Sequence, residues 1–372
     1  MTIHMNKTNT KSVRVCVCII CLFSLLLFTE QSNVLKMTSH AKEPVESTEK
    51  TDAGAASAKD SVTISLAGDC SLGKLSIHSY AGSFYEMYDL YGASCFFRNV
   101  KNIFEQDDMT LVNFEGVLTT SNKAVEKEFN IKGKPEFNQI LVEGGIDAVS
   151  FGNNHNKDYG VQSKLDTIAA FNEIGLPYAC DTAVGIYETA EGIRIGFVSV
   201  NEVYDGAKVE IYLKNGITEL KGQDVDLILA CCHWGVEREH YPEAYQTELG
   251  HKCIDWGADL VVGCHPHVLQ GIEKYNGKYI IYSLGNFCFG GNKNPKDKNS
   301  MIVQAVFPLT DGAVSGDAEL KIIPCTISSV TTRNDYCPTV ADEKKSASII
   351  QEMNSYSEQF GITIDAAGVV SK

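Results

Sequence analysis

The chain has 372 residues, of which 44% are hydrophobic and 21% are charged, a composition typical of a globular protein with a sizeable core. Its formal net charge of −15 argues against a nucleic-acid partner, because no basic stripe is offered to phosphates. An anionic substrate is still allowed, since bound metal ions would supply local positive charge.

The N-terminus predicts export from the cytoplasm. Basic residues precede an apolar run over residues 15–28, which is short for a membrane-spanning helix and typical of a signal sequence. We therefore predict that residues 1–30 form a signal peptide or an N-terminal membrane anchor. Residues 31–60 are polar and predict a flexible linker. The protein is expected to be extracytoplasmic, either membrane-anchored or secreted.

Apolar runs alternate with helical patterns along the rest of the chain. Strands are predicted at 61–67, 109–114, 146–151, 193–200, 225–232, 258–263, 279–284, 301–307 and 319–323, and helices at 162–174, 242–256 and 341–358. Continuous apolar strands alternating with helices predict a sheet that is buried on both faces. The last two strands have no helix between them and predict a second sheet packed on the first. The expected fold is a layered α/β sandwich.

One apolar run ends in the segment Val262-Gly263-Cys264-His265-Pro266-His267. Two imidazoles at positions i and i+2 just past a strand are expected to point to the same side of the chain. Such a pair presents two neutral nitrogen atoms to one site, as a pair of adjacent metal ions requires.

Four other apolar runs also end in side chains that bind metals, namely Asp69, Glu115, the triplet Asn153-Asn154-His155, and His233. Ligands in such folds bind at the carboxyl ends of strands, so these side chains are expected to meet at one edge. The predicted metal ligands are Asp69, Glu115, Asn154, His233, His265 and His267. Glu115 can bridge two cations with its two oxygens. The mixture of oxygen and nitrogen atoms favours two divalent ions of Mn, Fe or Zn.

Other residues of these segments are predicted to act on the substrate. His155, if unligated, would be the general acid, and Asp158 three residues later would orient its ring. Asp158 is equally compatible with a helix N-cap. Asn153, Glu237 and Asn286 are predicted to contact the substrate.

The cysteines offer no CxxC pair, which argues against a zinc ribbon or a thioredoxin-like motif. An exported chain can form disulfides, and Cys325 and Cys337 are the candidate pair. Cys70, Cys232 and Cys264 each neighbour a predicted ligand along a strand. They are therefore expected to face away from the site and to serve packing.

These segments, in this order, resemble the CapA family of bacterial capsule-synthesis proteins, also called poly-γ-glutamate biosynthesis proteins. The resemblance covers residues 61–310 and runs through Ala67-Gly68-Asp69, Asn113-Phe114-Glu115, Asn153-Asn154-His155-Asn156-Lys157-Asp158-Tyr159-Gly160, His233-Trp234-Gly235-Val236-Glu237, Gly263-Cys264-His265-Pro266-His267-Val268 and Tyr282-Ser283-Leu284-Gly285-Asn286-Phe287. It implies an α/β/β/α sandwich of the calcineurin-like metallophosphatase type over residues 61–340, followed by a C-terminal helix and tail over 341–372. It also implies a two-metal site.

The sequence departs from the phosphoesterase pattern at three motifs. The Asp-x-His motif is Asp69-Cys70-Ser71 here, so one ligand of the first metal is missing. Glu115 replaces the aspartate of the second motif. The Gly-Asn-His motif becomes Asn153-Asn154-His155.

The resemblance and the export signal favour a cell-envelope protein of capsule biosynthesis. Such a protein would act on an anionic polymer of the poly-γ-glutamate type, with capsule ligase or transporter proteins as partners. The site residues favour a metal-dependent hydrolase of phosphoesters or amides, which is compatible with that role or independent of it. A metal-assisted epimerase, with His155 or a metal hydroxide as the base, and a non-catalytic scaffold are the remaining alternatives.

Overall fold

The structure of the protein is a computed structural model that describes residues 59–372. The predicted signal or anchor at 1–30 and nearly all of the predicted linker lie outside these residues, so both stay predictions. Within residues 59–372, no helix is long and apolar enough to cross a membrane.

A nine-stranded sheet forms the first layer of strands in the described part of the chain. Its order is β18-β17-β15-β1-β3-β6-β7, with β14 beside β1 and β16 beside β15. The strands are β1 Ser61–Ser71, β3 Met109–Phe114, β6 Ala148–Ser150, β7 Tyr178–Ala179, β14 Asn286–Phe289, β15 Asn299–Thr310, β16 Ala313–Val314, β17 Glu319–Thr326 and β18 Thr339–Val340. β1 is parallel to β3 and β14 and antiparallel to β15.

A six-stranded sheet forms the second layer, again counted within residues 59–372, in the order β12-β13-β11-β10-β9-β8. The strands are β8 Gly185–Glu188, β9 Arg194–Asn201, β10 Leu227–His233, β11 Leu260–Cys264, β12 Ile272–Tyr275 and β13 Lys278–Ile281. β9, β10, β11 and β13 are parallel, and the two edge strands are antiparallel to their neighbours.

The predicted second sheet is therefore real, but the prediction of its strands was wrong. The late strands β15 and β17 pair antiparallel with β1 and extend the first sheet. The second sheet comes instead from the middle of the chain. The local pattern identifies a strand, whereas its hydrogen-bonding partner depends on long-range contacts.

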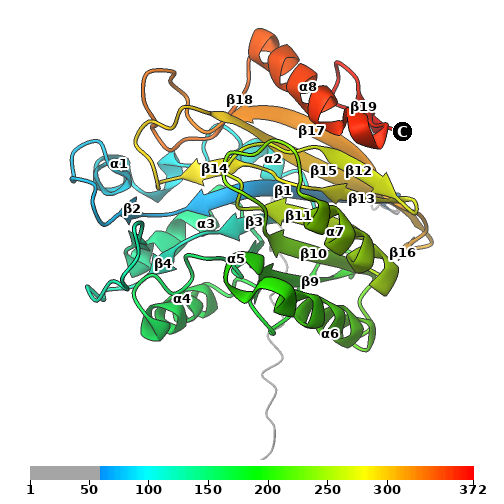
Figure 1. The fold of residues 1–372 in the computed structure, drawn as a ribbon, viewed down its shortest axis with the longest axis horizontal. Helices are drawn as coiled ribbons and strands as arrows, with labels where there is room; N and C mark the ends of the chain where they lie inside the picture. The colour runs from blue at the N-terminus through cyan, green and yellow to red at the C-terminus, as the bar shows by residue number, and fades with distance from the viewer. Residues whose placement is uncertain (1–58) are drawn as a thin grey trace, which may run out of the picture. The chain divides into compact units, whose positions relative to one another are not determined.

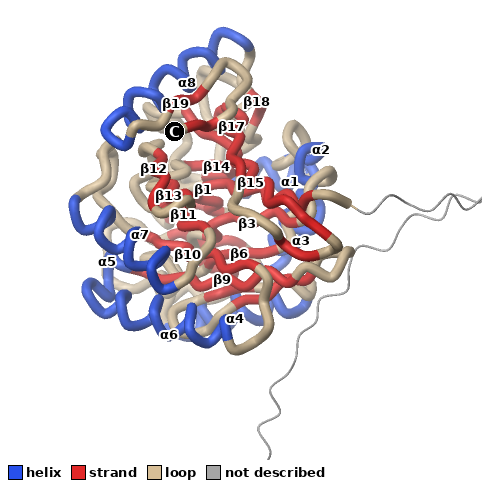
Figure 2. The backbone as a smooth tube through the Cα atoms, turned by 90° about the vertical axis from the view of Figure 1, so that its right-hand side faces the viewer, coloured by secondary structure: helices blue, strands red, loops and turns tan. Residues whose placement is uncertain are grey.

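Helices cover the outer faces of both sheets (Figures 1 and 2). Beside the first sheet lie α1 Phe84–Tyr91, α2 Lys101–Phe104, α3 Asn138–Gly144 and α4 Val161–Glu173, and beside the second lie α5 Glu202–Asp205, α6 Val209–Lys221 and α7 Ala244–Trp256. One apolar core lies between the sheets and two more lie beneath the helices. This arrangement confirms the predicted helix–sheet–sheet–helix sandwich.

The predicted C-terminal helix is α8 Glu343–Ser357. It buries Ile349, Ile350 and Met353 in the core between the two sheets, so it is more than a surface helix. The remaining short elements are β2 Lys74–Leu75, β4 Val117–Leu118, β5 Ile131–Gly133, β19 Thr363–Ile364 and β20 Val370–Ser371, with 3₁₀ turns at Ala93–Cys95, Pro135–Phe137, Gly206–Lys208 and Glu358–Phe360.

The cysteines of residues 59–372 are all free and buried. The predicted pairing of Cys325 with Cys337 was therefore wrong. Cys70 and Cys232 pack into the cores beneath the helices, as predicted. Cys264 is the register partner of His233 across β10 and β11 and so lies on the same face as that histidine, which makes its predicted orientation wrong.

Candidate metal centre

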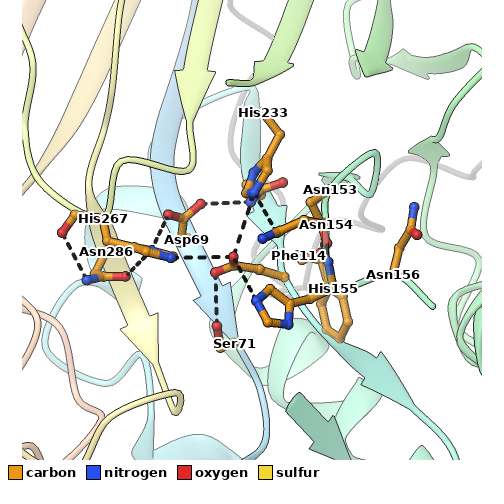
Figure 3. A network of polar contacts seen from close by, with 12 residues as sticks. Asp69, Ser71, Phe114, Asn153, Asn154, His155, Asn156, His233, His267 and Asn286 are labelled. Atoms are coloured by element: carbon orange, nitrogen blue, oxygen red, sulfur yellow. Dashed lines mark hydrogen bonds and ion pairs between the residues drawn. The ribbon is translucent and has the colours of Figure 1, made fainter. Parts of the chain in front are cut away.

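The candidate site lies where the carboxyl ends of strands from both sheets meet. The first sheet supplies Asp69 in β1 and Glu115 directly after β3, and the second supplies His233 at the end of β10. These three side chains are almost completely buried. Figure 3 shows Asp69 and His233 converging with His155 and His267 of two neighbouring loops.

Asp69 occupies an irregular position in β1, where the register with β3 shifts between Ala67 and Asp69. Gly68 allows this irregularity because a Cβ atom there would lie only 1.9 Å from the carbonyl oxygen of Gly285. The close approach lets the Asp69 backbone N–H donate to that oxygen at 2.9 Å. Gly68 is thus required by the packing of β1 against the segment before β14.

Glu115 is the centre of the cluster. Its Oε1 atom lies 3.7 Å from Nε2 of His233, 3.7 Å from Nε2 of His267 and 3.9 Å from Nε2 of His155. Its other oxygen, Oε2, accepts a hydrogen bond of 3.3 Å from the Ser71 hydroxyl. Three imidazoles therefore face one carboxylate oxygen that is completely buried.

His265 and His267 follow β11 and do converge on this site, but the predicted reason was wrong. Both have positive φ angles, 100° and 59°, so the segment is a left-handed loop rather than a continued strand. The two ring centroids lie 5.8 Å apart, and the His265 ring lies 4.8 Å from that of His233. Such backbone conformations cost energy for residues other than glycine, and they cluster at functional sites.

His267 is fixed by two neighbours. Its Nδ1 atom lies 3.0 Å from Oδ1 of Asn286 and 3.0 Å from Oδ2 of Asp69. The Asn286 amide nitrogen also donates to the His267 carbonyl at 3.0 Å. Asn286, which was predicted to contact substrate, thus orients the ring so that Nε2 faces Glu115.

His155 is held by the buried carboxylate of Asp158, as predicted. Nδ1 of His155 lies 2.6 Å from Oδ2 of Asp158, which also accepts from the Ile131 N–H at 2.6 Å. Because α4 begins after Gly160, Asp158 is not its N-cap. The proton shared with Asp158 at Nδ1 leaves Nε2 of His155 turned toward Glu115.

Lys127 is a site residue that the sequence did not reveal. Its Nζ atom lies 2.7 Å from Oδ1 of Asp158, 3.2 Å from Nδ1 of His155 and 3.0 Å from the Asn154 carbonyl. The lysine therefore neutralises the buried Asp158 and ties it to the loop that carries His155. It lies in a charged loop without periodicity, which offers no signal.

Asn113 is a second residue that was missed. Its amide nitrogen donates to Oδ1 of Asp69 at 2.7 Å and lies 3.3 Å from Nδ1 of His233, and its oxygen accepts from Ser150 at 3.0 Å. The other ring nitrogen of His233, Nε2, lies 2.9 Å from Oδ1 of Asn154. A polar residue near the end of the mostly apolar β3 was the available signal.

Two other predicted residues lie differently. Asn153 is completely buried, and its amide bonds the Phe114 carbonyl at 2.6 Å and the His155 N–H at 3.1 Å. That placement favours a role in fixing the loop over the predicted substrate contact. Glu237 is exposed on the loop after β10, and its charge acts on His267.

Burial and charge shift the pKa values of the cluster in opposite directions. Burial raises the pKa of Glu115 to about 7. Burial also disfavours a charged His267, but the Glu115 and Asp69 carboxylates outweigh it and raise its pKa to about 10. Burial and the neighbouring His267 lower the pKa of His265 to about 4, and the pKa of His233 is lowered by burial and by His265.

The residues present fit a metal-binding role. Two buried atoms of the cluster, Oε1 of Glu115 and Nδ1 of His265, have no hydrogen-bond partner within residues 59–372, and the only contact of Oδ2 of Asp69 given by the structure is with Nδ1 of His267 at 3.0 Å. Buried polar atoms without partners are costly, so their convergence fits a site built to hold a divalent cation. Ligand atoms of Asp69, Glu115 and His267 lie within 4.8 Å of one another. Burial raises the pKa of Cys264 well above its ordinary value, so the set is one of carboxylates and imidazoles.

Comparison with known proteins gives the family. Residues 63–291 match the model of the bacterial capsule synthesis protein PGA_cap. The PGA biosynthesis protein CapA of Bacillus subtilis is 31% identical over 284 residues, which cover 70% of this chain and 72% of that protein. The capsule biosynthesis protein CapA of Bacillus anthracis is 26% identical over 352 residues, which cover 88% of this chain and 79% of that protein.

The chain therefore belongs to the PGA_cap family of bacterial capsule synthesis proteins, as its motifs predicted. Among solved structures, the calcineurin-like phosphoesterase YfkN from Bacillus subtilis is similar, with a TM-score of 0.46 and 16% identity over 81% of this chain and 99% of that chain.

Proposed function

We propose that this protein acts outside the cytoplasm in the biosynthesis of an anionic capsule polymer of the poly-γ-glutamate type, and that its buried cluster is a metal-dependent hydrolytic centre. Membership of the PGA_cap family supports the first part. The apolar run at 15–28 supports export, with the N-terminus as a signal or membrane anchor. Capsule ligase or transporter proteins are the expected partners.

The observation that carries the hydrolytic role is the buried Oε1 atom of Glu115, without a hydrogen-bond partner within residues 59–372 and faced by three imidazoles. Asp69, Glu115 and His267 would hold one divalent ion. Glu115 would share a second with His233, His265 and Asn154. Mn, Fe or Zn suit these oxygen and nitrogen atoms. Such ions supply Lewis-acid stabilisation of negative charge on a substrate oxygen.

The chain's own residues supply the proton transfer. His155 shares one proton at Nδ1 with Asp158, and in its imidazolium form it carries a second proton at Nε2, which is the one given to the leaving oxygen or nitrogen. Asp158 and Lys127 hold the ring in that orientation. The bond cleaved would be a phosphoester or an amide.

Deletion of the gene tests the capsule role. The mutant bacterium is expected to lose its extracellular anionic polymer. The loss is measured as the glutamate that acid hydrolysis releases from the polymer bound to the cells. The wild-type gene is expected to restore it, and Glu115→Gln is not. Polymer that persists without the gene would contradict the capsule role, and full restoration by Glu115→Gln would favour a scaffold without metal chemistry.

Metal uptake is expected to release protons, so the affinity falls as the pH falls. His267 with a pKa of about 10 carries a proton at pH 7, and Glu115 with a pKa of about 7 is partly protonated there. Both must deprotonate to bind a metal, so each displaced proton changes the affinity by about tenfold per pH unit. Titration calorimetry in two buffers of different ionisation heat at pH 6, 7 and 8 measures this release. An affinity that does not vary with pH would contradict the ligand assignment.

Lys127→Met is expected to lower kcat by roughly 10- to 100-fold, because loss of the ammonium frees Asp158 and the His155 ring. Metal content should stay at the wild-type value. The measurement is the pH profile of kcat on a chromogenic phosphodiester and on γ-glutamyl-p-nitroanilide, with Lys127→Arg as the matched variant that keeps the charge. An unchanged kcat and pH profile in Lys127→Met would rule out this positioning role.

A further inference from the structure

A second feature of the structure is a cleft of about 1040 Å³ at a different place in the fold. It is formed by the loop between β14 and β15, the segments at the ends of β17 and β18, and the first turns of α8. Serine and threonine hydroxyls contribute to its lining. The charged residues of the lining are Lys296, Lys298, Lys344, Lys345, Asp297 and Asp342. We call it the lysine cleft.

The lysine cleft is basic although the chain carries a net charge of −15. Lysines outnumber acids in its lining, and none of the four lysines forms an ion pair with a carboxylate of residues 59–372. Lys298 bonds only neutral oxygens, those of Asn294 at 2.7 Å and Pro295 at 3.0 Å. These ammonium groups therefore keep their full charge for a ligand.

The two acids of the cleft are engaged with backbone. Asp297 accepts from the Asn299 N–H at 2.8 Å, and Asp342 accepts from the Lys345 N–H at 2.8 Å as the N-cap of α8. Both carboxylates stabilise local turns and form no ion pair with the four lysines, so four lysines against two acids leave the lining with an excess of positive charge. Since a cleft with one dominant sign of charge attracts ligands of the opposite sign, the expected ligand is anionic.

The wall of the lysine cleft is rigidly built. Buried Asp335 accepts hydrogen bonds from the Ser328 hydroxyl at 2.9 Å, the Ser329 N–H at 2.9 Å and the Cys337 N–H at 3.3 Å. A wall that is ordered before the ligand arrives reduces the entropy lost on binding.

This wall is also tied to the strand that supports the metal centre. The amide of Asn334 donates to the carbonyls of Phe289, at 2.7 Å, and Asn292, at 2.9 Å. Phe289 ends β14, and Asn286 at its start bonds His267. One short strand therefore connects the cleft wall with the candidate metal centre.

We propose that the lysine cleft binds a stretch of a linear polycarboxylate, a site separate from the metal centre. That the polymer is of the poly-γ-glutamate type rests on the proposed function. The positive charge of the cleft is independent of that function. Each exposed ammonium–carboxylate pair is weak and screened by salt. A polymer offers many carboxylates on one chain, so several weak pairs act together. The cleft thereby holds the polymer on the protein while the metal centre acts.

The test is equilibrium binding of end-labelled sodium poly-γ-glutamate to the full chain in detergent, at several salt concentrations. Lys296→Glu/Lys344→Glu is compared with Lys208→Glu/Lys214→Glu, because all four lysines are exposed and both pairs change the net charge equally. We expect the cleft variant to bind at least about tenfold more weakly at low salt, with a shallower salt dependence, and the control to bind within about twofold of the wild type.

Metal content and turnover of small chromogenic substrates are expected to be unchanged in the cleft variant, which separates this site from the proposed function. Three results would overturn the proposal. They are a wild-type chain that does not bind poly-γ-glutamate, equal losses in both double variants, or tighter binding of inorganic polyphosphate of the same charge number.

Discussion

Glu115→Gln is expected to empty the metal centre. Glutamine keeps the shape of the side chain but removes the negative charge that faces three imidazoles. Glu115 is the residue proposed to share both ions, so its loss weakens both sites at once. We expect metal content below about a tenth of the wild-type value and hydrolysis reduced by at least about a hundredfold. Elemental analysis and turnover of the chromogenic substrates measure both.

The same variant is expected to keep its fold. Burial raises the pKa of Glu115 to about 7, so a charged Glu115 opposes folding of the metal-free chain. This destabilisation grows as the pH rises from 4.5, the ordinary pKa of a glutamate, to about 7, the pKa of Glu115 in the folded chain. Glutamine carries no charge and removes it. Glutamine also removes the attraction between Glu115 and His267, so the metal-free variant should melt within a few degrees of the metal-free wild type at pH 7.5. Glu128→Gln, at an exposed position of a nearby loop, is the control. Wild-type metal content in Glu115→Gln would contradict the assignment.

His155→Ala is expected to abolish turnover without emptying the metal centre. The ring is oriented by Asp158 and offers Nε2 toward Glu115, which suits a general acid. Loss of a general acid costs about 10²- to 10⁴-fold in rate. The measurement is kcat on the chromogenic phosphodiester and the γ-glutamyl amide, together with metal content.

Two comparisons sharpen this prediction. Added imidazole is expected to restore part of the activity of His155→Ala, because the vacated space lies beside the buried Asp158. Asp158→Asn should lower kcat less than His155→Ala, since the ring is still present. If His155→Ala lost its metal together with its activity, His155 would be a ligand instead of the acid.

The local pattern of the sequence was sufficient for most strands and for the side chains at their ends. β3 was predicted at its observed bounds, and the site at the carboxyl ends of the strands was predicted from residues such as Asp69, Glu115 and His233. The strand prediction worked because burial on both faces makes a strand continuously apolar, and the same contrast makes a polar residue at its end conspicuous. The assignment of these residues as metal ligands stays a prediction.

Features that depend on tertiary contacts were not accessible in this way. The pairing of β15 and β17 with β1 joins distant parts of the chain. The orientation of His265 and His267 was predicted from the way side chains alternate along a strand. Their positive φ angles show that the backbone there is not a strand. Lys127 reaches Asp158 across thirty-one positions of sequence. Ser71, two positions after Asp69, donates to Glu115.

The most direct test of the metal centre is elemental analysis of the purified wild-type chain, prepared without chelators. The predicted result is about two Mn, Fe or Zn ions per chain. The contradicting result is a folded protein that contains no metal and takes up none when Mn or Zn is added.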